Sequence, residues 1–275
     1  MDQSLHQKSG KSRWLSVLLI VAPATLASIL MLIAYLTQYD GPEANYFRLG
    51  APLPMIAALF ASLTVIAGTV LAVRLPISTD SLRLSSTTRA SAVSAAGFLI
   101  CAALQSVVAS ETGVKWYFIV TLILLLLSIC YFIFSIRNPD SEPAHDLLIL
   151  LGIAPVFSLI FLCAIHYFDK SVEMNAPVKA TVLLGLLTAI LTVTGDIRRL
   201  IGTAHPRIEL VLWSCSLAAG ALVFPAVPVA FFTGALEKSA YLASSFAVLG
   251  CSVASGIRIV DSLRHADSET EVTQS

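Results

Sequence analysis

The sequence predicts an all-α integral membrane protein, built as a bundle of eight transmembrane helices. Of its 275 residues, 57% are hydrophobic and only 12% are charged, whereas about a quarter of the residues in soluble domains are charged. The chain also contains eight stretches of at least 16 residues without Asp, Glu, Lys or Arg. These stretches cover residues 14–39, 49–73, 90–110, 116–136, 147–168, 180–195, 210–236 and 239–257.

The apolar stretches have about the length that a membrane-crossing helix requires. At about 1.5 Å rise per residue, a helix needs roughly 20 residues to cross a hydrocarbon core of ~30 Å. Backbone groups in lipid must be hydrogen-bonded within the protein, so helices are expected rather than open strands. The predicted helices are 14–38, 50–73, 90–110, 116–136, 147–168, 178–197, 209–234 and 239–259.

These helices are expected to form a single transmembrane domain, residues 14–260. Residues 1–13 are predicted to be a cytoplasmic N-terminal segment, and the polar residues 261–275 a disordered cytoplasmic tail. Lys8, Lys11 and Arg13 precede the first apolar stretch as they would in a signal peptide. At about 26 residues that stretch is too long for the apolar region of a signal peptide, so we expect a retained first helix.

The distribution of basic residues predicts the orientation of the helices. If successive helices alternate in direction, 12 of the 17 Lys and Arg residues lie on the side that holds both termini. Basic residues accumulate in cytoplasmic loops. We therefore expect a multi-pass protein of the plasma (cytoplasmic) membrane with both termini in the cytoplasm. The five basic residues on the other side are Arg48, Lys115, Lys170, Lys179 and Lys238.

Similar short sequences recur where alternate helices end. "LAVR", "FSIR", "GDIR" and "SGIR" finish at arginines that are 63, 61 and 60 residues apart, which predicts four successive helical hairpins. The alternative is that any helix end at this side of a membrane favours Arg. "LLIVAPATLAS" also matches "LLGIAPVFSLI" when Pro23 is aligned with Pro155. This match favours a 4+4 parallel pseudo-repeat, although abundant Leu and Ala make such matches common.

One polar stripe interrupts the sixth apolar stretch. Thr188, Thr192 and Asp196 are spaced at i, i+4 and i+8, so they share one face of a helix. Charges at membrane depth are costly and mark ion or proton pathways. We therefore define a candidate polar track of these three residues and Gln105, the one amide well inside a span. In the alternative interpretation, Asp196 pairs with Arg199, each Thr bonds its own helix backbone and Gln105 bonds a neighbouring helix.

Three arginines follow Asp196 and are candidate contacts for an anionic lipid headgroup. Arg198, Arg199 and Arg207 could hold a phosphate through paired N–H groups. Their alternative role is to mark the ends of two helices at the cytoplasmic surface.

The motifs predict neither a catalytic centre nor a bound cofactor. HExxH, GxSxG, Walker and paired-carboxylate patterns are absent from the sequence, and the five cysteines form no CxxC motif. We therefore expect no catalytic residue, metal or cofactor. A formal net charge of zero indicates no nucleic-acid partner.

The predicted function is that of a small-molecule or ion transporter resembling a permease in architecture. The alternative is a non-enzymatic scaffold or partner subunit, which would bind other membrane subunits as well as the lipid bilayer. An enzyme acting on lipid headgroups is the least favoured alternative, because the arginines lack a second well-placed carboxylate.

Overall fold

The computed structural model describes residues 3–40, 46–74, 86–112, 115–137, 142–173, 176–232 and 239–265. These residues contain eight helices that are long and apolar enough to cross a membrane, which confirms the predicted fold class. The helices are α1 (Gln3–Thr37), α3 (Pro52–Arg74), α4 (Ser86–Thr112), α5 (Trp116–Arg137), α6 (Glu142–Phe168), α7 (Pro177–Leu200), α8 (Pro206–Phe232) and α9 (Ser239–His265).

Several helices extend beyond the apolar stretches that predicted them. Helix α1 begins at Gln3, inside the predicted N-terminal segment, and α9 continues to His265, inside the predicted tail. A stretch without charges marks only the part of a helix that crosses lipid, whereas helical hydrogen bonds continue into the polar turns beyond it. Residues 266–275, where disorder was predicted, lie outside the described residues.

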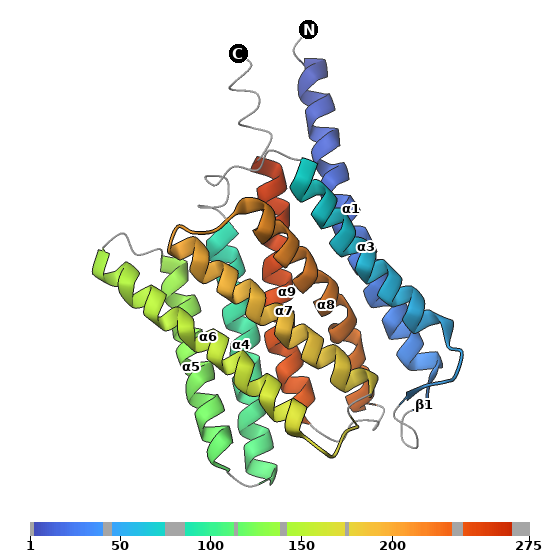
Figure 1. Cartoon of the computed structure of the whole chain (residues 1–275), viewed down its shortest axis with the longest axis vertical. Coiled ribbons are helices and arrows are strands. Elements are labelled where there is room, and N and C mark those ends of the chain that lie inside the picture. The colour runs from blue at the N-terminus through green and yellow to red at the C-terminus, as the bar shows by residue number, and fades with distance from the viewer. Residues whose placement is uncertain are drawn as a thin grey trace.

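The helices run alternately up and down, and α1 begins at the end of the bundle where α9 finishes (Figure 1). We call this the basic end, because α3 finishes there at Arg74 and α7 finishes just after Arg198 and Arg199. The other end we call the aromatic end. It carries Tyr35, Tyr39, Tyr46, Phe47, Trp116, Tyr117, Tyr167, Phe168 and Tyr241.

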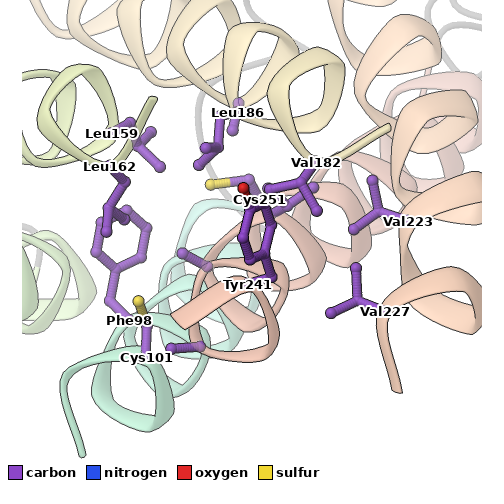
Figure 2. Close-up of a cluster of buried hydrophobic side chains, with 14 of the residues drawn as sticks. Phe98, Cys101, Leu159, Leu162, Val182, Leu186, Val223, Val227, Tyr241 and Cys251 are labelled. Carbon is purple, nitrogen blue, oxygen red and sulfur yellow. The ribbon is translucent and has the colours of Figure 1, made fainter. Parts of the chain in front are cut away.

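Helices α8 and α9 form the centre of the bundle. Helix α9 packs against α4, α7 and α8, while α8 also packs against α1 and α3. The pair α1–α3 covers one flank and the pair α5–α6 the other (Figure 1). In the apolar core, Val223 and Val227 of α8 face Leu162 of α6, with Tyr241 of α9 between them (Figure 2).

Helices α4 and α9 make close backbone contact at two glycines. A Cβ atom built on Gly97 would lie 2.6 Å from the carbonyl oxygen of Phe246 and 2.8 Å from the Cα atom of Gly250. Such close backbone contact is typical of helices that associate in lipid through small residues. The adjacent small residues of α9 are buried as well: Ala243, Ala247, Cys251 and Ser255.

The four predicted hairpins are present, since α1–α3, α4–α5, α6–α7 and α8–α9 each pack together. The two halves of the chain nevertheless pack differently. Helix α3 lies against α1 and α8, whereas its counterpart in a 4+4 repeat, α7, packs against the helices on both sides of it in the chain and against α9.

A small antiparallel ribbon at the aromatic end was not predicted. Strand β1 (Tyr39–Asp40) pairs with β2 (Tyr46–Phe47), and Tyr39 lies opposite Phe47. Two-residue strands are too short to show a period of two in the sequence.

Candidate functional site

The connection between α7 and α8 brings charged residues together at the basic end. Gly202 has a φ of +80° and its N–H donates to the carbonyl of Arg199, while the N–H of Thr203 donates to the carbonyl of Arg198. This pair of bonds is a Schellman motif, which requires a left-handed residue and therefore favours Gly. Pro206 then begins α8, where its missing N–H has no helical partner to lose.

Asp196 makes two ion pairs, one within α7 and one to α9. Its Oδ1 atom accepts from Nη2 of Arg199, and its Oδ2 atom lies 2.7 Å from Nη2 of Arg258. Asp196 is 7% exposed and Arg258 only 2% exposed. The carboxylate is therefore a buried link between α7 and α9.

Glu209, in the first turn of α8, is completely buried beside the same residues. Neither of its carboxylate oxygens has a hydrogen-bond partner among the described residues. It lies against Gly195 of α7, where an added Cβ would be 2.5 Å from Oε2. Only a glycine at this position lets the carboxyl group lie so close to α7.

Arg199 is close enough to act on both carboxylates. It bonds Asp196, and its guanidinium also lies over the ring of Trp213, 5.2 Å from the centroid. Trp213 is one helical turn beyond Glu209, so both are on the same face of α8. We call Asp196, Arg199, Glu209 and Arg258 the charge cluster.

The charge cluster is incompletely hydrogen-bonded. A buried ion costs several kcal/mol to desolvate unless its partners compensate, and Asp196 has such partners in two guanidinium groups. Glu209 has none, and the Nε atoms of Arg199 and Arg258 have no hydrogen-bond partner among the described residues. Buried polar groups are nearly always hydrogen-bonded, so these exceptions require an explanation.

The threonines of the candidate polar track bond their own helix. Thr188 donates to the carbonyl of Gly185 and Thr192 to that of Thr188, at 2.9 Å in both cases. This is the arrangement that the alternative interpretation predicted, as is the pair between Asp196 and Arg199. The interpretation did not include the second pair of Asp196, with Arg258.

Gln105 is not placed with the other members of the track. It lies in the part of α4 toward the aromatic end, whereas Thr192 lies in the part of α7 toward the basic end. Its side chain is 4% exposed, and neither amide atom has a hydrogen-bond partner among the described residues. The structure therefore joins Thr188, Thr192 and Asp196 along one helix and leaves Gln105 apart.

The three candidate headgroup arginines are also separated. Arg199 turns into the charge cluster, while Arg207 is exposed and Arg198 contacts the carbonyl of Thr203 in the connection, 3.4 Å away. Two of the three arginines thus remain at the surface of the basic end.

A second polar network lies at the aromatic end. His166 of α6 is 2.6 Å from the hydroxyl of Ser244 and stacks on Tyr241, both in α9. Lys179 of α7 is buried and donates to the carbonyls of Asp169 and Val172 just after α6, at 2.6 and 3.1 Å. We call His166, Asp169, Lys179, Tyr241 and Ser244 the His166 network.

The described residues contain no group of three or more His, Cys, Asp or Glu side chains that could hold a metal ion. No protein family, curated protein or solved structure matches this chain. The chemistry of the charge cluster is therefore the basis for a functional proposal.

Proposed function

We propose that this multi-pass membrane protein is a small-molecule or ion transporter of the plasma membrane. We further propose that both termini are cytoplasmic and that the charge cluster is the cytoplasmic gate. The observation that supports this role is the charge cluster itself, which gathers four ionisable side chains from three helices at the basic end. Asp196, Glu209 and Arg258 are buried, and Arg199 is partly buried. Ionisable residues inside a membrane bundle are expensive and typically serve a pathway for an ion or substrate.

The charge cluster has the properties of a contact that can open. The pair between Asp196 and Arg258 joins α7 to α9, and Coulomb attraction of this kind weakens strongly when water enters. Pro225 and Pro228 lie inside α8, where each removes a backbone hydrogen bond and favours bending. Separation of the helix ends would therefore hydrate the charges and be accommodated within α8.

Transport is tested on the full chain in liposomes, with uptake of a panel of labelled amino acids, sugars, nucleosides and organic cations. Currents driven by Na⁺, K⁺ and H⁺ gradients are recorded in parallel. We expect flux of at least one compound, and a larger substrate-independent leak in Asp196→Asn. Asp40→Asn is the matched control, because Asp40 of β1 forms an exposed ion pair with Arg48.

The proposed orientation is tested with reporters that are active on only one side of the membrane. A reporter inserted near Tyr46 should be external, and one fused after Arg264 should be cytoplasmic. The reverse result would place the charge cluster at the external side.

A scaffold or partner subunit is the second candidate, favoured by the tight α4–α9 contact and by the threonines that bond their own helix. It predicts purification in a fixed ratio with another membrane protein. If that result is accompanied by no flux of any compound in the panel, the transporter proposal is wrong. In both roles we propose that the protein is not an enzyme.

A further inference from the structure

We propose that Glu209 is a proton-binding site. We further propose that its protonation state determines whether Arg199 bonds Asp196 of α7 or Glu209 of α8. The proton site stands on the geometry alone, whereas its control of a gate rests on the proposed function. In the arrangement described here Arg199 bonds Asp196 in its own helix, and Glu209 lacks a partner. We assign this arrangement to the proton-loaded form.

The charged side chains around Glu209 come from a small number of helices. Helix α7 supplies Asp196, Arg198 and Arg199, and α9 supplies Arg258. Helices α1 and α3 also pack on α8, but the sequence has no Asp, Glu, Lys or Arg in residues 14–37 and 52–73. In the part of the chain that the structure describes, the charged side chains that act on Glu209 belong to α7 and α9. His205 and Arg207, which are close to Glu209 in the sequence, are exposed.

Opposing influences act on the two protonation states of this carboxyl group. Complete burial without a hydrogen-bond donor disfavours the charged form. The neighbouring guanidinium groups and the N-terminus of α8 favour it. A site on which opposing influences act can exchange a proton, whereas a site with only one of them would keep a single state.

The proposed step is a single proton transfer. One oxygen of the Glu209 carboxylate accepts a proton from a hydronium ion that enters from the basic end, leaving a water molecule, and the reverse transfer releases the proton. No other covalent bond forms or breaks. In the proton-free form, Arg199 turns from Asp196 to the ionised Glu209 while it remains over Trp213.

This exchange changes which helices are connected. The bond from Arg199 to Asp196 lies within α7, whereas a bond from Arg199 to Glu209 would connect α7 to α8. The pair between Asp196 and Arg258 connects α7 to α9 in either form. Proton uptake therefore releases α8 from α7 and frees the helix that contains Pro225 and Pro228.

The test is a pH titration of the full chain in liposomes by infrared difference spectroscopy, which detects the carbonyl stretch of protonated carboxyl groups. We expect a band that grows as the pH falls, disappears in Glu209→Gln and persists in Glu173→Gln. Glu173 is an exposed residue between α6 and α7 and is the matched control. In Arg199→Gln, loss of the neighbouring charge should raise the midpoint of the band by about 1–3 pH units.

Labelling of Glu side chains with ¹³C gives a second measurement that does not depend on a variant that folds poorly. The band should shift in the labelled wild-type protein, and Glu209→Asp should replace it with an unlabelled band. The proton site is refuted if no band between about pH 4 and 9 is lost in Glu209→Gln or moved by the label.

The same liposomes separate this proposal from the proposed function. Substrate flux that keeps the wild-type pH dependence in Glu209→Gln would overturn proton control and leave the transporter standing. A Glu209 band in a protein that moves no compound of the panel would support the proton site and overturn the transporter.

Discussion

The charge cluster and the His166 network occupy opposite ends of the same bundle, and both place buried ionisable side chains between α7, α9 and a third helix. They differ in how those side chains are satisfied. Lys179 bonds two carbonyl oxygens and His166 contacts a hydroxyl group. In the charge cluster, Glu209 and two guanidinium Nε atoms lack partners among the described residues.

This difference distinguishes a buried charge that stabilises one arrangement of the helices from a buried charge that can exchange partners. Lys179 bonds two carbonyl oxygens just after α6 at the same time, so it satisfies backbone groups that no longer have a helical partner. Arg199 has two carboxylates within the same cluster but bonds only one of them. A side chain that can bond either of two partners can give two alternative arrangements of the helices that carry them.

The largest expected effect is that of Asp196→Ala. Removal of this carboxylate leaves Arg258 buried without an ion-pair partner among the described residues, and breaking a buried ion pair in this way costs about 3–5 kcal/mol. The variant should unfold at a markedly lower temperature in detergent micelles, as followed by tryptophan fluorescence. Asp40→Ala, which breaks an exposed pair with Arg48, should lose only about 0–1 kcal/mol. Equal losses in the two variants would show that the charge cluster does not hold the helix ends together.

The membrane class was predictable because it depends on composition and on the length of the stretches without charged residues. Eight long stretches without charged residues allowed little but eight helices, and arginines at regular intervals marked where each hairpin ends. Which helices pack against one another was harder to predict from the sequence. The contact of Gly97 with Gly250 joins segments far apart in the sequence, and nothing in the spacing of either glycine indicates its partner.

The charge cluster was predictable only in part, and for a physical reason. Asp196 and Arg199 are three residues apart on one helix, so spacing alone predicted their pair. In the sequence, Arg258 is one of the four arginines that recur at helix ends, and Glu209 is the first residue of the predicted helix 209–234. Both are buried by tertiary packing. The one local signal was Gly195, since a glycine inside a helix costs stability unless something must approach the backbone.

A smaller effect is expected for Lys179→Met in the His166 network. The substitution keeps an unbranched apolar chain but leaves the carbonyls of Asp169 and Val172 without this donor. The loss should be about 1–3 kcal/mol, the usual cost of an unsatisfied buried group. The pH dependence of unfolding should match that of the wild type in the same thermal assay. A changed pH dependence would mean that the His166 network also switches, which would remove the distinction between the two ends.

Gly195→Ala should change stability by less than about 1 kcal/mol, because an alanine favours the helix while its Cβ displaces the carboxyl group of Glu209. Its main expected result is a shifted or lost Glu209 band in the infrared titration. Gly256→Ala is the matched control, since its Cβ would meet Leu217 at an ordinary 3.5 Å. An unshifted band in Gly195→Ala would show that close contact with α7 does not set the properties of Glu209.

The smallest effect is expected for the double variant Arg198→Lys with Arg207→Lys. Both arginines lie outside the charge cluster, and surface substitutions of this kind change stability by about 0.5 kcal/mol or less. Lysine keeps the positive charge but cannot bind a phosphate with two parallel N–H groups. Retention of phosphatidylglycerol, measured by native mass spectrometry, should therefore equal that of the wild type and of Arg48→Lys. A specific loss of lipid in the double variant would show that the surface arginines form a headgroup site, and that Arg199 was separated from them to serve the buried carboxylates instead.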